Sequence, residues 1–410
     1  LISYNNNKLE NHAFSLVVGT ELSGSKSYNN YHRSPEFNDY YRFIAFPDFP
    51  SDDISYNDIK NSLSGLIGTA EAQDRSASFF GALTYTLCDK YVFNLNARFD
   101  GADIIGTDNR FTPLWSASFR WNAMRENFLK DVNFISDLAI RLSYGYTGNI
   151  DRSSYPIPMI FLSGYRYDEN FVAESVTFPN PNIKWERKQD RNFGLDFGFW
   201  DNRIGGSFNY YWNTGKDLLG TMTTPESYGR TSIKANVSSI ENTGWEFNVN
   251  LRLDLGANVR WINSFNIAQN TNKIKKTYLK DLNELNVMGG SDNIEGYASG
   301  SMFGYRFAGV NPLTGQAMIY LTDESRKILA DYRGVDISQV ADKIDTEEID
   351  YNIREELLRA SMEKLGSVTP KVTGGFSSTL TWKKLEVRAS FAYSAGHLLE
   401  TFNERKYAPS

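Results

Sequence analysis

The sequence predicts an all-β protein: a transmembrane antiparallel β-barrel, with about eleven spanning strands in this chain. Apolar and polar residues alternate over segments of about ten residues, the length that a tilted membrane strand needs. The polar positions carry Arg, Glu and Asp, and the connections between segments are short and long in turn. These three observations favour a barrel that surrounds a water-filled lumen.

The spanning strands follow from this alternation in chain order. In 91–100, Tyr91 and Phe93 alternate with Asn94 and Asn96, and in 241–253 Trp245 precedes a similar alternation. An alternating pattern of this kind places one set of side chains on each face of a strand. Residues 1–410 are therefore predicted to form one partial barrel domain, with strands near 10–21, 76–87, 91–100, 113–121, 138–148, 189–199, 203–213, 241–253, 259–272, 372–382 and 385–396.

A soluble two-sheet sandwich also alternates, so alternation alone leaves both folds open. Strands of soluble proteins cluster near five or six residues, however, and the predicted strands are about twice as long. Aromatic residues such as Trp115, Trp121 and Tyr393 lie toward the ends of the apolar faces, as in the girdles of membrane barrels. These features favour the membrane barrel.

The connections predict which end of the barrel faces outward. Short turns at 88–90, 200–203 and 383–384 are expected at one end. The other end carries the long loops, which bacterial barrels place on the extracellular side. These are 22–75, 101–112, 149–185, 214–240 and 273–370.

The last of these loops has a pattern of its own. Residues 302–310 and 316–321 are predicted to form a hairpin within the loop. Further on, Val340, Ile344, Ile353, Leu357 and Met362 recur at helical spacing among acidic residues, which predicts an amphipathic helix on the outside. An odd number of strands does not make a finished bacterial barrel, so we expect the chain to be part of a larger one.

Composition excludes several classes of function. The formal net charge of −6 and the lack of a basic cluster argue against nucleic-acid binding. Cys88 and three scattered histidines have no zinc-binding spacing, so no metal site is predicted. The sequence has no nucleophile elbow and no phosphate-binding glycine loop, so neither an enzyme nor a cofactor is expected.

A set of short motifs resembles the barrel of SusC/RagA-type TonB-dependent transporters of Bacteroidetes. The matching segments follow the family's order from about residue 76 to 396, and include 182–186, 192–198, 202–207, 241–246, 308–315 and 369–377. The resemblance implies an outer-membrane barrel of 22 strands in a Gram-negative bacterium, filled by a plug domain that is not in this chain. It also implies uptake of oligosaccharides or oligopeptides, a SusD-like lipoprotein over the extracellular mouth, and energy from TonB through a segment absent here. The acidic stretch 336–365 departs from the shared motifs.

Candidate binding residues lie in two long loops. Rings can stack on sugars or pack against peptide side chains, while Arg and Asp supply directed hydrogen bonds. Loop packing, or contact with the lipoprotein, is the other explanation for them. The candidates are Tyr155, Phe161, Tyr165, Arg166, Tyr167 and Asp168 in one loop, and Tyr228 and Arg230 in the other.

Five arginines are predicted to face the lumen, where they could contact the plug or tune passage. Pairing with neighbouring carboxylates is an equally good explanation. They are Arg98, Arg120, Arg141, Arg252 and Arg388.

Two classes of function remain from the sequence. The first is an importer that works with a SusD-like lipoprotein in outer-membrane lipid, with a glycan slightly favoured over a peptide as cargo. The second is a non-transporting surface barrel or adhesin, or a soluble β-rich glycan-binding protein.

Overall fold

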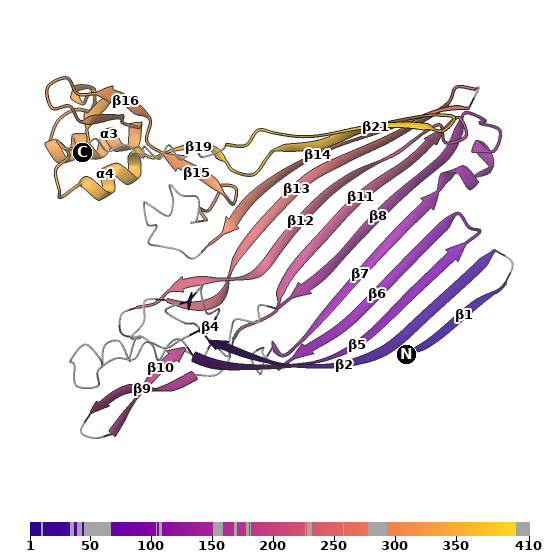
Figure 1. Cartoon of the computed structure of the whole chain (residues 1–410), viewed down its shortest axis with the longest axis horizontal. Helices are drawn as coiled ribbons and strands as arrows, with labels where there is room; N and C mark the ends of the chain where they lie inside the picture. Colours follow the sequence, from indigo (N-terminus) through magenta and orange to yellow (C-terminus); the bar gives the residue numbers. More distant parts are fainter. Residues whose placement is uncertain are drawn as a thin grey trace.

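The computed structural model shows a large curved antiparallel sheet of twelve strands, with a small helical module beyond one end (Figure 1). The structure describes residues 1–9, 11–32, 37–38, 43–44, 67–103, 105, 109–150, 159–167, 170–177, 180, 182–225, 227, 232–256, 258–277 and 293–398. Its large sheet has the order β1-β2-β5-β6-β7-β8-β11-β12-β13-β14-β20-β21. Neighbouring strands in the sheet are therefore also successive sheet strands in the chain, as in a meander.

The strands of the sheet are long. Their bounds are β1 (Ile2–Leu9), β2 (His12–His32), β5 (Ile67–Leu87), β6 (Tyr91–Ala102), β7 (Phe111–Asn122), β8 (Ile135–Asn149), β11 (Glu186–Phe199), β12 (Ile204–Thr223), β13 (Ser232–Asp254), β14 (Val259–Lys276), β20 (Val372–Trp382) and β21 (Leu385–Ala395). Smaller pairs are formed by β3 (Phe37–Asn38) with β4 (Phe43–Ile44), and by β9 (Met159–Tyr167) with β10 (Asn170–Thr177).

Each predicted strand corresponds to one strand of the sheet, and β1 is an additional strand that the prediction lacked. The large sheet of this chain therefore has an even number of strands, and the predicted odd number was wrong. The sequence hides β1 because Asn5, Asn6 and Asn7 interrupt any apolar alternation. The turn after β1 lies beside the turn at 88–90, where the amide of Cys88 donates to the carbonyl of Asn11 at 2.6 Å.

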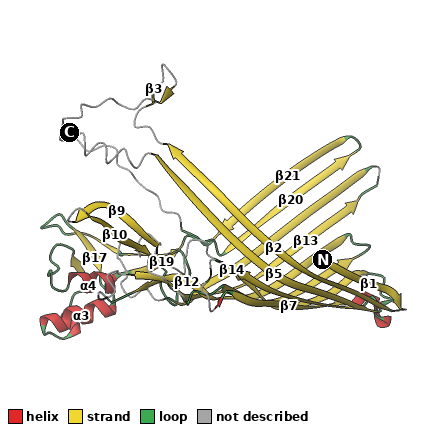
Figure 2. Cartoon of the chain, turned by 90° about the horizontal axis from the view of Figure 1, so that it is seen from below, coloured by secondary structure: helices red, strands yellow, loops and turns green. Residues whose placement is uncertain are grey.

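Several strands continue well into segments predicted as loops. Strands β2 and β5 have 21 residues each and pair over their whole length, from His12 with Leu87 to His32 with Ile67. Figure 2 shows this pair extending past the rest of the sheet. The extensions lack strict apolar alternation because a hairpin in water needs backbone pairing but no continuous apolar face. The loops 22–75 and 214–240 are correspondingly shorter than predicted.

The two faces of the sheet differ in chemistry, and the strand register shows this directly. Residues that pair directly across neighbouring strands point to the same face. Phe93 pairs with Phe119, and Phe119 with Leu142, so these side chains form one apolar row across three strands. On the other face, Asn94 pairs with Ser118, and Ser118 with Ser143. We call these surfaces the apolar face and the polar face.

Tight turns close the end of the sheet that the sequence assigned to short connections. Positive φ values occur at Cys88 and Asp89, and at three successive residues from Trp200 to Asn202. Short hairpins need left-handed residues because their backbone twist then matches that of the strands. The positions of the short turns were therefore predicted correctly.

A longer connection at this end joins β7 to β8. Glu126 stabilises it from its position between the 3₁₀ turns η2 (Ala123–Arg125) and η3 (Asn127–Leu129). The ammonium of Lys90 donates to the Glu126 carboxylate at 2.8 Å, and Tyr91 and Trp121 also donate to it. These donors, Lys90 first, lower the pKa of Glu126 to about 2. Hydrogen bonds to the charged form of a carboxyl group favour that form.

The loop between β14 and β20 contains a folded module. Strands β15 (Ser301–Gly304) and β19 (Glu363–Ser367) pair at its base. Between them in the chain lie a sheet of β16 (Phe307–Val310), β17 (Ala317–Tyr320) and β18 (Lys343–Asp345), the helices α3 (Asp323–Arg333) and α4 (Arg354–Ser361), and the 3₁₀ turn η5 (Ile337–Gln339). The predicted hairpin is therefore confirmed in part, as β16 and β17, whereas residues 302–304 belong to β15 and pair with β19.

The predicted helix through 336–365 was only partly right. Leu357 lies on α4, but Val340 and Ile344 lie on η5's C-terminal flank and on β18. Together with Ile353 they belong to a buried core shared by the helices and the small sheet. The recurring apolar residues therefore mark the core of a compact module, and their helical spacing was fortuitous.

A buried carboxylate fixes the turn between β16 and β17. Asp345 is 1% exposed and accepts hydrogen bonds from Asn311 Nδ2 at 2.8 Å and Thr314 Oγ1 at 2.6 Å. These bonds, together with one from the amide of Glu347, hold the pKa of Asp345 below its usual value.

Across the parts of the chain that the structure describes, no helix is long and apolar enough to span a lipid bilayer.

Candidate functional site

The polar face carries a charged network centred on Asp196 of β11. Arg120 of β7 donates to one carboxylate oxygen of Asp196 at 3.0 Å, and Arg141 of β8 donates to the other at 2.8 Å. The Asp196 side chain is 20% exposed, whereas the two arginine side chains are nearly twice as exposed. The network joins three neighbouring strands and leaves an excess of positive charge on the polar face.

Arg141 extends beyond this network because the strand next to it carries a glycine. Its Nη2 reaches across β11 to Asn209 of β12, at 2.9 Å. Gly194 is on β11, the strand between β8 and β12. A Cβ atom on it would lie 3.0 Å from the guanidinium carbon of Arg141. A glycine therefore leaves the path by which one side chain crosses a whole strand.

The same arrangement occurs on the next strands. Tyr211 of β12 crosses over Gly244 of β13, and its hydroxyl donates to Asn270 Oδ1 of β14 at 3.1 Å. A Cβ atom on Gly244 would lie 2.5 Å from that hydroxyl and 2.3 Å from the carbonyl oxygen of Gln269. Both crossings direct polar groups over the sheet surface.

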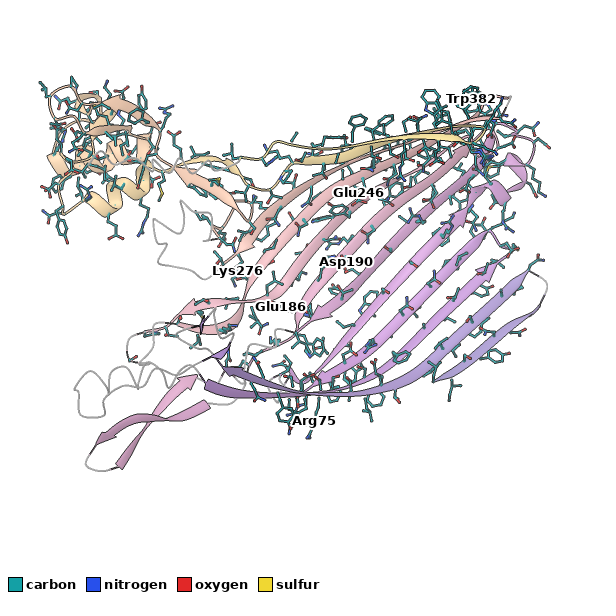
Figure 3. The ribbon with its side chains drawn as sticks, viewed as in Figure 1. Arg75, Glu186, Asp190, Glu246, Lys276 and Trp382 are labelled. Carbon is teal, nitrogen blue, oxygen red and sulfur yellow. The ribbon has the colours of Figure 1, made fainter. Side chains whose placement is uncertain are left out.

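These residues border a hollow on the polar face with a volume of about 610 Å³. Amide side chains dominate its wall, and it carries two positive groups, Arg141 and Lys188, and one carboxylate, Glu246. Figure 3 shows Asp190 and Glu246 on neighbouring parts of the sheet, and Asp190 accepts from Lys188 Nζ at 2.7 Å. We call this region the amide hollow; its lining is Arg141, Ser143, Lys188, Asn192, Asn209, Tyr211, Asn213, Asn242, Glu246 and Asn270.

The hydrogen-bonding groups of the amide hollow suit a neutral, polar oligomer. Each Asn side chain offers both a donor and an acceptor, so it can match hydroxyl groups or peptide groups equally well. Within the wall, the side-chain oxygens of Asn209 and Asn270 already accept hydrogen bonds from Arg141 and Tyr211. Each NH₂ group adds a donor to the wall.

The other predicted arginines also lie on strands of the sheet, and most have carboxylate partners. Arg98 donates to Asp100 at 2.5 Å and to Glu21 at 3.0 Å, and Arg252 lies 3.3 Å from Asp254. Arg388 is exposed on the edge strand β21, opposite Thr379. For Arg98, Arg120, Arg141 and Arg252 the structure thus shows pairing with neighbouring carboxylates, one of the two explanations that the sequence left open.

The aromatic loop predicted from the sequence is not joined to the amide hollow by any described contact. Phe161, Tyr165, Arg166 and Tyr167 lie on β9, which pairs with β10 in a separate hairpin, and the structure describes only their backbone. Tyr155, Asp168, Tyr228 and Arg230 lie outside the described residues. Their role in binding stays a prediction.

Sequence reasoning missed the amide hollow as a unit. The alternation placed Asn209 and Glu246 on the polar side of their strands, but it did not show which residues of five strands meet. The available signal was the glycine opposite a long side chain, as at Gly194 and Gly244, which could have indicated the crossings. No group of three metal-binding side chains is close enough together in the described part of the chain to hold an ion.

The sequence matches a known family over most of its length. A family profile described as TonB dependent receptor-like, beta-barrel matches residues 2–347. TonB-dependent receptor P3 of Formosa agariphila is 30% identical over 372 residues, which cover 86% of this chain and 35% of that protein. TonB-dependent receptor SusC of Bacteroides thetaiotaomicron is 35% identical over 207 residues, covering 48% of this chain and 21% of that protein.

The fold is similar to that of a solved transporter. The structure of the RagAB peptide transporter superposes with a TM-score of 0.76 at 24% sequence identity, covering 96% of this chain and 40% of that chain. The chain therefore spans about a third of the Formosa relative, and less than half of the matched transporter chain.

Proposed function

The chain belongs to the TonB dependent receptor-like β-barrel family, and we propose that it is the barrel part of a SusC/RagA-type nutrient importer in the outer membrane of a Gram-negative bacterium. The observation that carries the proposal is the two-faced sheet. Its apolar face suits lipid, and its polar face, with paired charges and the amide hollow, suits a lumen through which a hydrated cargo passes.

The cargo that we propose is a neutral oligosaccharide, with an oligopeptide as the alternative. A wall with both signs of charge and many amides has no single-sign field that would favour an anionic polymer. One matched structure is that of the RagAB peptide transporter, so the peptide alternative needs an equal test.

The partners that we propose are a SusD-like lipoprotein at the long-loop end and TonB. Support for the first comes from that end of the sheet, where the module of 301–367 and the β9–β10 hairpin both project (Figure 1). Long loops that are ordered are often lids or binding surfaces. Energy coupling would use parts of the longer protein.

Uptake by intact cells tests the proposal. Cells that carry the full-length protein should accumulate a labelled oligosaccharide or oligopeptide, and cells that lack either the protein or TonB should not. The variant Tyr165→Ala/Tyr167→Ala then tests whether the predicted loop contacts the cargo. Equal accumulation of every cargo with and without the protein would instead support a surface barrel that does not transport.

A further inference from the structure

The apolar face has a hollow of its own, with a volume of about 640 Å³. It follows a row of directly paired residues: Leu83 with Leu95, Leu95 with Ala117, and Ala117 with Tyr144. Ala117 is the smallest member of this row, so the surface is depressed at its centre. Around it stand large apolar side chains, among them Phe93, Phe119, Leu142 and Phe193.

A positive charge closes the row on β11, in the half of that strand nearer the long loops. Arg191 pairs with Tyr144 in the register, so it lies on the apolar face, whereas its neighbour Asp190 lies on the polar face. Its guanidinium carbon is 4.4 Å from the ring centre of Trp212, which also lines the hollow. An arginine among the lipid-facing residues needs a reason, because a charge there is costly unless it reaches water or a counter-ion.

Carboxylates on β11, β12 and β13 toward the long loops already have other partners. Asp217 pairs with Arg187 at 2.6 Å, Glu241 with Lys275 at 3.0 Å, and Asp190 with Lys188. A second positive group, Lys216, lies on the same face, because it is directly opposite Arg187 in the register of β11 and β12. Among the described side chains, no carboxylate forms an ion pair with Arg191 or Lys216. The end of the hollow therefore has spare positive charge.

We propose that the hollow is a specific site for an anionic lipid of the outer leaflet, a multiply acylated lipid with a phosphate on its headgroup. Its acyl chains occupy the depression over Ala117, and its phosphate accepts hydrogen bonds from the Arg191 guanidinium, whose planar donors suit phosphate. Lys216, on the neighbouring strand β12, adds attraction from farther toward the long loops. The leaflet follows from the proposed function, on which this inference rests, because the long loops are then extracellular.

The opposite end of the sheet provides a comparison within the same molecule. Lys383, in the turn between β20 and β21, lies 5.6 Å from the ring centre of Trp382. This cation and indole form an ordinary interfacial anchor at the other membrane surface, and neither residue lines the hollow. A specific lipid site predicts that the two pairs behave differently, whereas two ordinary anchors would behave alike.

The test uses the full-length protein, inserted in nanodiscs of phosphatidylcholine with a small fraction of phosphorylated lipid A. Native mass spectrometry counts the lipid A molecules that stay bound to the protein when the phosphatidylcholine is removed. Arg191→Gln should lower the occupancy of one tightly bound lipid A by about tenfold, the effect of losing one charge-assisted hydrogen-bonding group. Ala117→Trp fills the depression without changing charge, and it should reduce occupancy as well.

The control Lys383→Asn removes a positive charge beside a tryptophan at the far end, and it should leave occupancy unchanged. Equal retention by wild type, Arg191→Gln and Ala117→Trp would overturn the site. Equal losses for Arg191→Gln and Lys383→Asn would also overturn it, in favour of non-specific attraction. A wild-type protein that does not insert into nanodiscs at all would contradict the proposed membrane function instead, so the two failures are distinct.

Discussion

At the level of single residues, the polar face depends on glycines that let long side chains cross neighbouring strands. Gly244 shows this most clearly, because an added Cβ would meet a backbone carbonyl oxygen that cannot rotate away. Replacing it forces either Tyr211 or the β13–β14 pairing to move. The hydrogen bond from Tyr211 to Asn270 would be lost with it.

We therefore expect Gly244→Ala to destabilise the barrel by about 1–3 kcal/mol, the usual cost of overpacking. Thermal unfolding followed by heat-modifiable migration on gels measures this effect. The matched control is Gly205→Ala on β12, where an added Cβ has only ordinary contacts, 3.7 Å from the carbonyl oxygen of Phe197. Equal melting temperatures for Gly244→Ala and Gly205→Ala would contradict the crossing of Tyr211 over Gly244.

Glu126 predicts a pH dependence at the short-turn end. Its pKa is about 2 in the folded protein and 4.5 for the ordinary group. Its contribution to stability is therefore complete above about pH 4.5 and is lost as the pH falls toward 2. Glu126→Gln should lower the melting temperature relative to wild type at pH 6, and this difference should shrink between pH 4.5 and 2. A difference that stays constant over that range would exclude the carboxylate as its cause.

At the level of elements, the spanning strands could be predicted because lipid on one side and water on the other impose strict alternation, as between Phe247 and Asn248. Strand β1 and the outer parts of β2 and β5 could not, because backbone pairing in water leaves no such pattern. The fold of the module between β14 and β20 was harder still to predict. Val340, Ile344 and Leu357 belong to one core, yet they come from a turn flank, a strand and a helix.

This core predicts that the module unfolds separately from the barrel. Leu357 is fully buried, so Leu357→Ala should cost about 2–5 kcal/mol of the module's stability. Hydrogen exchange should then increase across α3 and α4 while β13 keeps its protection. Tyr351→Ala, at a residue that is 91% exposed, should change the exchange of neither. Loss of protection in β13 as well would show that module and barrel are one cooperative unit.

At the level of the whole molecule, the resemblance to SusC/RagA-type receptors and the all-β barrel fold are confirmed by the matching family, the relatives and the strand order. The candidate site was predicted less well. Alternation shows on which face a residue such as Arg141 lies, but the contact that it makes across Gly194 depends on register between strands. Register is a property of paired strands, and a single sequence does not contain it explicitly.

The central claim is that the two faces of this sheet separate lipid from the lumen. Nitroxide spin labels at successive positions 245–250 of β13, in full-length protein with Cys88→Ser, test it in native outer membranes. Oxygen concentrates in lipid, so its collisions with the label should be frequent at 245, 247 and 249 and rare at 246, 248 and 250. Collision rates without this alternation, or with the opposite phase, would contradict a membrane barrel.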